Sequence, residues 1–249
     1  MSLADRSRRI TDWMQHRLVP ELRYSQDHFE GFLRDRTRGV QTWLDLGCGH
    51  QLLPDWRLEA EREMVTQVPV VVGIDYDMES LRKHRSLRTV ARADARSLPF
   101  SSDTFDLVTA NMVVEHLDDP TRQFAEIGRV LKPGGRFVFH TPNSLSYDVR
   151  IARLLPDSLK QHLARILEGR QESDVFPTHY RANSLEDITR VATAAGLDLE
   201  SAVFVSTLPV FASVPPLALA ELLALRVLRR DSLAPYRSNI MCALRKRSV

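Results

Sequence analysis

Two glycines and two acids in the first third of the chain have the types and the spacing to hold a nucleoside. The stretch from Gln41 reads Q-T-W-L-D-L-G-C-G-H-Q, then a helical run, then V-P-V-V-V-G-I-D-Y-D. Gly47 and Gly49 let the backbone turn tightly, so that a ligand can lie against its amides. Asp75 ends the second apolar run, where it can accept hydrogen bonds from a ribose diol. Together these residues indicate nucleoside binding.

A strand, a loop, a helix and a second strand must position these residues. The pattern predicts a strand over 40–46, a helix over Leu52–Gln67 and a strand over Val68–Ile74. The second strand is rich in β-branched residues, which is typical of a parallel strand buried on both faces. Because open parallel sheets bind ligands at the carboxyl ends of their strands, the glycine loop lies where a ligand is expected.

The alternation of helices and strands continues through most of the chain. The pattern predicts further helices over Met78–Leu87, Asp119–Leu131 and Ser184–Ala195, and strands over Arg88–Arg92, Phe105–Ala110, Arg136–His140, Leu199–Ser206 and Ser238–Leu244. This alternation predicts an α/β fold with a doubly wound, mostly parallel sheet and flanking helices.

A single domain over residues 1–249 is expected, with two insertions. Residues 1–39 carry two leading helices, Leu3–Val19 and Gln26–Arg36, and residues 40–142 form the core that holds the ligand. The alternation breaks over 144–182, where a helix is expected around Val149–Leu167, and again over 207–230. We expect the two insertions to form an acceptor pocket or its cover.

The overall composition indicates an ordinary globular protein. The 249 residues are 43% hydrophobic, and 34 basic side chains nearly balance 32 acidic ones, so no polyanionic partner such as a nucleic acid is expected. Cys48 and Cys242 lie far apart and predict neither a disulfide framework nor a metal site. The polar start lacks the pattern of a secretory signal, so a cytoplasmic protein is expected.

With these motifs laid out, residues 40–142, and less closely 178–198, resemble the class I S-adenosylmethionine-dependent methyltransferases. The resemblance implies S-adenosylmethionine as cofactor and a seven-stranded sheet whose last strand is antiparallel. It also implies that Asp45, Gly47 and Gly49 hold the methionine half of the cofactor and that Asp75 holds the ribose. The later run L-K-P-G-G-R-F-V-F resembles a turn and strand of the same family.

The resemblance extends to the loops after the third and fourth strands. Asp94 matches the acid that accepts a hydrogen bond from the adenine amine, and the amide of Ala95 would donate to the ring. Asn111 and Met112 match positions whose backbone faces the amino group of the cofactor. One departure is Gln51, which stands where the family loop commonly has a third glycine; a lower cofactor affinity is one expected consequence.

Three more residues are expected beside the cofactor. Cys48 lies between the two glycines, where a small side chain fits, and no nearby base predicts a nucleophilic role for it. Tyr76 follows the ribose acid directly. Tyr24 could close over the nucleotide as a lid, although an aromatic anchor for a helix on the core is the other interpretation.

Methyl transfer asks little of the protein beyond holding the acceptor in line with the methyl group and excluding water. A base is needed only if the acceptor must lose a proton. His140, at the end of the fifth predicted strand, and His179, in P-T-H-Y-R, are the candidates to face an acceptor. His116 is more readily explained by packing or helix capping.

The stretch Val203–Leu228 is the most apolar part of the chain. Its prolines and Glu221 argue against a membrane-spanning helix, which needs about 20 uninterrupted apolar residues. Its last part could cover the acceptor pocket, form a dimer contact, or lie on a membrane with its arginines against anionic lipid. We favour the cover, and both a monomer and a homodimer stay open.

The function expected is methyl transfer to an oxygen, nitrogen or carbon of a small molecule such as a lipid, a glycan precursor or a secondary metabolite. A nucleic-acid or protein methyltransferase ranks lower, because N-M-V-V stands where amine-methylating family members often carry an Asn/Asp-Pro-Pro-aromatic run. A nicotinamide-binding oxidoreductase is a further alternative, but it would need a third glycine in the loop, where Leu53 stands. A non-catalytic module that binds the cofactor stays open.

Overall fold

The computed structural model describes residues 3–154 and 177–248, and these fall into two compact units. The described part of the first unit is 3–27, 142–154, 177 and 204–239; that of the second is 28–141, 178–203 and 240–248. Most of the described residues of the two expected insertions belong to the first unit. That the chain folds as one domain, and that the insertions form the acceptor pocket, stay predictions.

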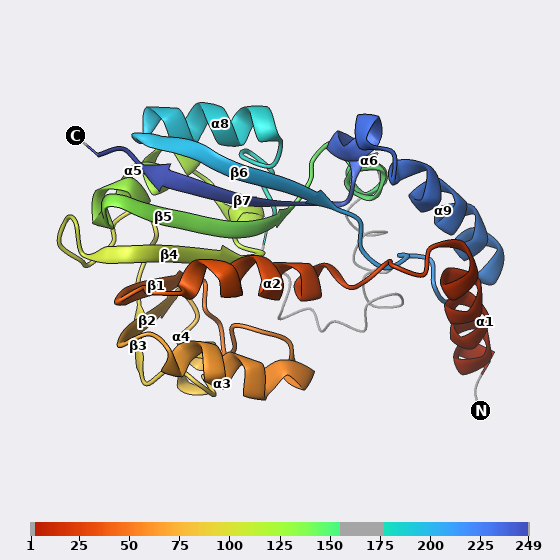
Figure 1. Ribbon diagram of the computed structural model, residues 1–249, viewed down its shortest axis with the longest axis horizontal. Coiled ribbons are helices and arrows are strands. Elements are labelled where there is room, and N and C mark those ends of the chain that lie inside the picture. The colour runs from red at the N-terminus through yellow and green to blue at the C-terminus, as the bar shows by residue number, and fades with distance from the viewer. Residues whose placement is uncertain (1–2, 155–176, 249) are drawn as a thin grey trace. The chain divides into compact units, whose positions relative to one another are not determined.

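The helices and strands follow the expected alternation (Figure 1). The helices are α1 (Leu3–Leu18), α2 (Ser25–Thr37), α3 (Leu58–Thr66), α4 (Met78–Arg82), α5 (Pro120–Val130), α6 (Tyr147–Leu154), α8 (Leu185–Ala194) and α9 (Pro215–Leu228), with short 3-10 helices η1 (Asp55–Arg57), η2 (Val114–His116) and η4 (Asp231–Tyr236). The strands are β1 (Thr42–Leu46), β2 (Val70–Asp75), β3 (Thr89–Arg92), β4 (Phe105–Asn111), β5 (Leu131–Pro142), β6 (Leu197–Val205) and β7 (Asn239–Lys246).

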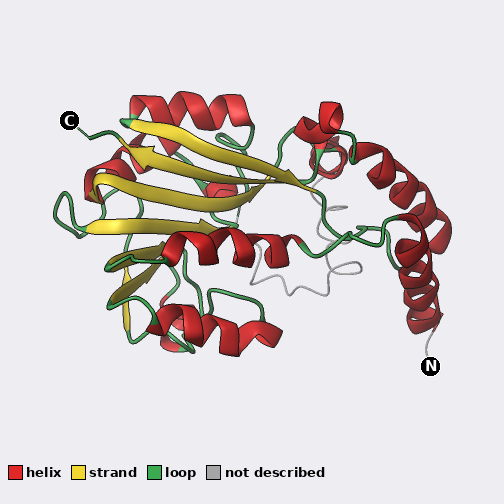
Figure 2. Ribbon diagram, viewed as in Figure 1, coloured by secondary structure: helices red, strands yellow, loops and turns green. Residues whose placement is uncertain are grey.

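The second unit is built on one seven-stranded sheet in the order β3-β2-β1-β4-β5-β7-β6. Strands β1 to β5 are parallel to their neighbours, and β7 enters the sheet antiparallel, which confirms the expected fold class. Helices lie on both sides of the strands (Figure 2). Two consecutive β1 residues, Trp43 and Leu44, are fully buried, because both faces of the central strands are covered.

The register of the parallel strands brings the candidate residues to one edge of the sheet. Leu46 pairs with Ile74 of β2 and with Ala110 of β4, and Asn111 pairs with His140 of β5. One step further along the chain, at the same edge, stand Gly47, Asp75, Asn111 and His140. Four residues that are far apart in sequence therefore lie side by side.

The first unit is helical. Its core contains Val19, Leu222 and Leu225, and Tyr147 of α6 packs against this cluster. The hydroxyl of Tyr147 donates to the buried carboxylate of Glu221 at 2.5 Å, and burial raises the pKa of that hydroxyl. A polar bond thus ties α6 to α9 beside the apolar cluster.

Two expectations about the elements need correction, and a third is only partly tested. The helix expected over Leu52–Gln67 begins later, as η1 and then α3, because Leu52 and Leu53 form a buried loop. The helix expected over Met78–Leu87 ends at Arg82. In the segment that follows, the ring of His84 accepts the backbone N–H of Leu87 at 3.1 Å, a bond that replaces helical pairing. Part of the helix expected over Val149–Leu167 lies outside the described residues.

Strand β2 is less buried than its β-branched sequence predicts. Val70 is 48% exposed, and only Gly73 and Ile74 of this strand are buried. The reason lies in its neighbour, because β3 is a short edge strand of four residues whose side chains are mostly exposed.

Candidate functional site

The glycine loop after β1 has the backbone conformation that its residues predict. Gly47 and Gly49 have φ angles of +64° and +52°, a region that L side chains rarely adopt. A Cβ on Gly47 would lie 2.4 Å from Cγ2 of Val113, so this glycine is needed for packing. A Cβ on Gly49 would meet no atom within 4 Å. The backbone at Gly49 therefore borders open space that a ligand can fill.

A matched pair of glycine variants tests whether that space is the cofactor site. Gly39 also has a positive φ, +76°, and its Cβ would also meet nothing within 4 Å. Gly49→Ala and Gly39→Ala should therefore lose similar stability, about 1–2 kcal/mol each. Only Gly49→Ala should weaken S-adenosylmethionine binding, by about five- to hundredfold, because its methyl group enters the ligand space. Calorimetry and urea unfolding measure both; equal affinities in the two variants would contradict this assignment.

Cys48 is part of the packing beneath the loop. Its Sγ lies 2.7 Å from where a Cβ on Gly73 would stand, and its backbone N–H donates to the carbonyl of Ile74 at 3.1 Å. Burial raises the pKa of this thiol well above its usual range. The side chain thus fills the gap between β1 and β2.

Asp75 is held directly against the glycine loop. One carboxylate oxygen accepts the N–H of Gly49 at 2.9 Å, and the other accepts the N–H of Asp77 at 2.8 Å. Because a carboxylate offers about four acceptor positions, these two bonds leave capacity for a diol. Tyr76, beside it, is 65% exposed, and the guanidinium of Arg92 lies 4.6 Å from its ring centroid. That Asp75 binds the ribose stays a prediction.

Asp45 is buried at the end of β1. Its carboxylate accepts the hydroxyl of Thr109, which in turn accepts Nε1 of Trp43 at 2.6 Å. Burial raises the pKa of Asp45 from 3.8 to about 7; the bond from Thr109 lowers it, while the charges of Glu61 and Asp75 raise it further. The carboxyl therefore keeps its proton to a higher pH than an exposed aspartic acid does.

The raised pKa makes a prediction about stability and pH. Asp45 binds its proton more tightly in the folded chain, so its stabilising effect is complete below its ordinary value of 3.8 and is lost as the pH rises through about 7. Asp45→Asn, which does not titrate, should remove this effect. Between about pH 5 and about pH 8 the urea midpoint of the wild type should therefore fall more than that of the variant. An identical fall in both proteins would contradict the raised pKa.

Asp94 has a partner that the sequence motifs do not reveal. Arg96 donates to it from its backbone N–H at 2.8 Å and from its guanidinium at 2.6 Å, and the same guanidinium reaches Asp118 at 2.9 Å. The hydrogen bond from the Arg96 side chain lowers the pKa of Asp94. Ala95 lies in the turn that these bonds close. The carboxylate is thus fixed and ionised, as an acceptor for an adenine amine must be.

The ends of β4 and β5 meet at a buried polar pair. His140 is fully buried; its Nδ1 lies 3.0 Å from Oδ1 of Asn111, and its ring stacks on Phe29 with centroids 5.5 Å apart. Met112 has a φ of +56°, and its N–H donates to the carbonyl of His140 at 2.8 Å. His140 therefore contacts Asn111 and Met112 at the carboxyl ends of β4 and β5, and Phe29 of α2. Its role as a base stays a prediction.

The segment around His179 is anchored beside the same strand ends. The carbonyl of Glu115 accepts the backbone N–H of His179 at 2.7 Å and that of Tyr180 at 3.2 Å. The buried Glu115 carboxylate accepts the hydroxyl of Thr141 at 3.0 Å, and Asn183 donates to that hydroxyl oxygen at 2.7 Å. The side chain of His179 is exposed. The other candidate outside the core, Tyr24, is 39% exposed and belongs to the first unit, so its lid role stays a prediction.

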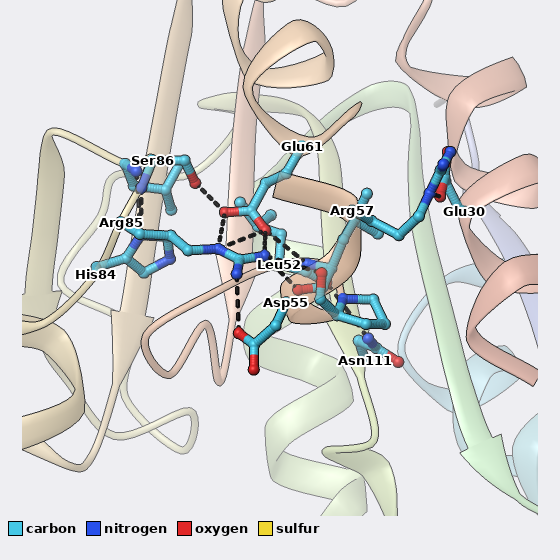
Figure 3. A network of polar contacts seen from close by, with 12 residues as sticks. Glu30, Leu52, Asp55, Arg57, Glu61, His84, Arg85, Ser86 and Asn111 are labelled. Atoms are coloured by element: carbon cyan, nitrogen blue, oxygen red, sulfur yellow. Dashed lines mark hydrogen bonds and ion pairs between the residues drawn. The ribbon is translucent and has the colours of Figure 1, made fainter. Parts of the chain in front are cut away.

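A buried ion pair supports the loop that follows the glycines (Figure 3). Glu61 of α3 accepts the N–H of Leu53 at 2.9 Å, Nη2 of Arg85 at 2.6 Å and the hydroxyl of Ser86. Arg85 also donates to the carbonyl oxygens of Leu53, at 2.7 Å, and Pro54, at 3.2 Å. We call Glu61 and Arg85 the loop clamp. Burial raises the pKa of Glu61, but the donors outweigh it and the pKa is lowered.

The loop clamp acts where the third family glycine is missing. The N–H of Gln51 donates to the carbonyl of Cys48 at 3.2 Å, and the N–H of Arg85 donates to the carbonyl of His50 at 3.1 Å. Backbone bonds therefore hold Cys48 to Gln51, and the side chains of the loop clamp hold Leu53 and Pro54. Motif reasoning missed both clamp residues. The one signal in the sequence was an acid, Glu61, at a buried helical position.

The residues present fit S-adenosylmethionine as far as their own geometry goes. Open space borders Gly49, a fixed carboxylate with acceptor capacity stands at Asp75, a second lies at Asp94, and a buried acid at Asp45 would gain from a cationic group nearby. Asp75 would thus accept from the ribose diol, Asp94 would accept from the adenine amine, and Asp45 would supply a counter-charge for the methionine half. These are the assignments that the resemblance implies.

Comparisons with known proteins agree with this geometry. Residues 4–202 match the model of a family described as "Methyltransferase domain". A demethylmenaquinone methyltransferase of Lactiplantibacillus plantarum is 36% identical over 105 residues, which are 38% of this chain and 42% of that protein. A malonyl-[acyl-carrier protein] O-methyltransferase of Hahella chejuensis is 34% identical over 108 residues, or 41% and 36% of the two chains. The chain spans less than two thirds of the length of these relatives.

Solved structures share the fold at low sequence identity. An S-adenosylmethionine-dependent methyltransferase from Mesorhizobium loti superposes with a TM-score of 0.56 at 18% identity, over 89% of this chain and all of the other. A geranyl diphosphate methyltransferase in complex with S-adenosylmethionine gives 0.53 at 19%, over 87% and 84%. At such identity the likeness concerns the fold alone.

Proposed function

The chain belongs to the methyltransferase-domain family, and on that premise we propose that it transfers a methyl group from S-adenosylmethionine to a small molecule. The observation that carries the proposal is the anchoring of His179 and Tyr180 on Glu115, which sets a segment with titratable side chains beside the ends of β4 and β5. A relative named for demethylmenaquinone supports this acceptor class.

The cofactor supplies a sulfonium whose methyl group is already a strong electrophile. The protein's own task is to orient and to exclude water. In this proposal the Gly47–Gly49 backbone and Asp45 bind the methionine half, and Asp75 and Asp94 bind the ribose and the adenine. Asn111, held by His140, and the backbone of Met112 complete the cofactor edge.

The acceptor side is proposed to lie next to Glu115. The chain Glu115–Thr141–Asn183 consists of buried groups bonded to one another, which fixes the segment before α8. Imidazole is a common general base near neutral pH, so the exposed His179 side chain can take a proton from an acceptor hydroxyl or amine. An acceptor carbon that is already nucleophilic needs no such base.

A labelled-methyl screen tests the acceptor class. The protein is incubated with methyl-labelled S-adenosylmethionine and, separately, with a small-molecule extract, a lipid extract, nucleic acid and cell protein. We expect label in a small-molecule or lipid product that is absent from a Gly49→Ala control. Label only in nucleic acid or protein would contradict the proposal, and an absence of label in every pool would favour a cofactor-binding module without turnover.

His179→Ala is expected to slow turnover by about 10²- to 10⁴-fold if the acceptor must lose a proton. S-adenosylmethionine affinity should stay unchanged, because the predicted contact is with the acceptor only. The matched control is His16→Ala, since His16 is an exposed histidine in the first unit. A normal rate for His179→Ala, at both neutral and low pH, would remove the residue from the reaction.

A further inference from the structure

Helix α9 leaves one of its two apolar sides uncovered. Its inner side carries Leu222 and Leu225, which are buried in the core of the first unit. Its outer side carries Leu219, Leu223 and Val227, which are 40%, 47% and 47% exposed. Residues four apart lie above one another on a helix, so these three form a continuous stripe. We call it the outer stripe of α9.

The charge around the outer stripe is positive. Arg226, Arg229 and Arg230 stand at the end of the helix and are exposed, and Arg229 pairs with Glu21 at 2.6 Å. The sequence Pro215–Leu228 contains one acid, Glu221. That acid is buried on the inner side, where it accepts the N–H groups of Val210 and Phe211 at 2.9 Å each. The outer stripe is therefore flanked by arginines; the exposed acids near its end are Glu21, which pairs with Arg229, and Asp231, which lies 3.7 Å from Arg237.

Helix α1, which packs beside α9, repeats this arrangement. Ile10 and Trp13 are 49% and 63% exposed, and Arg6, Arg9 and Arg17 lie at the helical spacing that places them on the same side. The guanidinium of Arg17 lies 5.6 Å from the Trp13 ring centroid. A tryptophan flanked by arginines is typical of a helix that lies at a membrane surface.

A second copy of the chain fits these faces poorly. Parallel pairing of two α9 helices would bring their arginine clusters together. Antiparallel pairing would set each cluster against the positive N-terminal end of the partner helix. An anionic lipid surface offers an apolar layer for the leucines and phosphates for the arginines. Among the described residues no helix is long and apolar enough to cross a bilayer, so contact would be with one surface.

We propose that the first unit binds the surface of anionic membranes through the outer stripe of α9 and the exposed side of α1. The apolar side chains enter the headgroup region and the arginines meet lipid phosphates. This inference does not rest on the identity of the methyl acceptor, because it concerns residues outside the cofactor edge. A failed acceptor screen would leave it standing, and failed lipid binding would leave the proposed function standing.

Co-sedimentation of the full chain with vesicles tests the proposal. The wild type should bind phosphatidylcholine vesicles that contain phosphatidylglycerol, and should bind pure phosphatidylcholine vesicles far less. Leu219→Glu with Leu223→Glu should weaken binding by at least about tenfold, because the apolar area that each leucine would bury in the membrane is lost. Arg226→Gln with Arg230→Gln should weaken it by about fivefold per charge and reduce its salt dependence.

Matched controls separate a specific surface from a general effect. Leu199→Glu changes an apolar residue of β6 that is 38% exposed in the second unit, and Arg62→Gln with Arg82→Gln removes two exposed charges there. These variants should bind vesicles like the wild type, and circular dichroism should show that all variants are folded. Failure of the wild type to bind anionic vesicles, or equal losses in the controls, would overturn the proposal. A dimer of the wild type in analytical ultracentrifugation that Leu223→Glu converts to a monomer would also overturn the proposal, because the outer stripe would then contact a second copy of the chain.

Discussion

Replacing Glu61 with glutamine should lower the free energy of unfolding by about 3–5 kcal/mol, because it removes the buried counter-charge of the Arg85 guanidinium and leaves only the exposed Asp55, 3.0 Å away. The side chain of Glu61 is fully buried and that of Arg85 is 18% exposed, so water compensates little of the loss. Since the loop clamp holds Leu53 and Pro54, S-adenosylmethionine affinity should fall as well. Urea unfolding and calorimetry measure the two effects separately.

The matched control is Glu59→Gln, which removes an exposed charge two residues earlier on the same helix. It should change the free energy of unfolding by no more than about 0.5 kcal/mol and leave cofactor affinity unchanged. If Glu61→Gln lowered stability but kept full affinity at a temperature where it is folded, the loop clamp would stabilise the fold without shaping the cofactor loop. A wild-type unfolding curve for Glu61→Gln would contradict the account of the clamp itself.

Asp75→Ala should weaken S-adenosylmethionine binding by about 2–4 kcal/mol, or roughly thirty- to a thousandfold. Two losses combine in this variant. The ribose diol loses its charged acceptor, and the N–H of Gly49 loses the carboxylate that holds it at 2.9 Å. Titration calorimetry measures the change directly.

Two companions sharpen this test. Asp75→Asn keeps an acceptor for one N–H and should recover part of the affinity that Asp75→Ala loses. Asp198→Ala removes an exposed acid that pairs with Arg247 at 2.7 Å, and it should bind the cofactor like the wild type. Unchanged affinity in Asp75→Ala would refute the ribose assignment, whatever happens to turnover.

The strand ends of the fold were predictable because their signals are local. Asp45, Gly47 and Asp75 each stand directly after an apolar run, and parallel strands align such positions without further information. Glycine at positions 47 and 49 also permits the positive φ angles that the turn requires.

The contacts that hold those ends were not predictable in the same way. The partner of Glu61 is Arg85, and nothing in the spacing of 24 residues marks them as a pair. Arg85 also lies where the pattern favours a continuing helix, and the structure ends that helix through the ring of His84. The bonds from Arg96 to Asp94 were not predicted, because an arginine two residues after an acid is common on protein surfaces. Long-range pairing of this kind depends on the whole fold.

Burial was the other quantity that residue types did not settle. Val70 belongs to a run of β-branched residues, yet it is 48% exposed because β3 beside it is short. His140 was expected to face an acceptor, and the structure places its ring at full burial against Phe29. Whether that ring moves a proton or positions Asn111 depends on the neighbours that the fold brings to it.

The central claim is that the carboxyl ends of β1, β2 and β4, with the loop after β3, bind S-adenosylmethionine. Titration calorimetry of the full chain with S-adenosylmethionine and with its demethylated product tests this most directly. We predict that both compounds bind with one site per chain and that Gly49→Ala weakens the binding of both by about five- to hundredfold, while Gly39→Ala does not. No measurable binding of either compound to the folded wild type would contradict the claim.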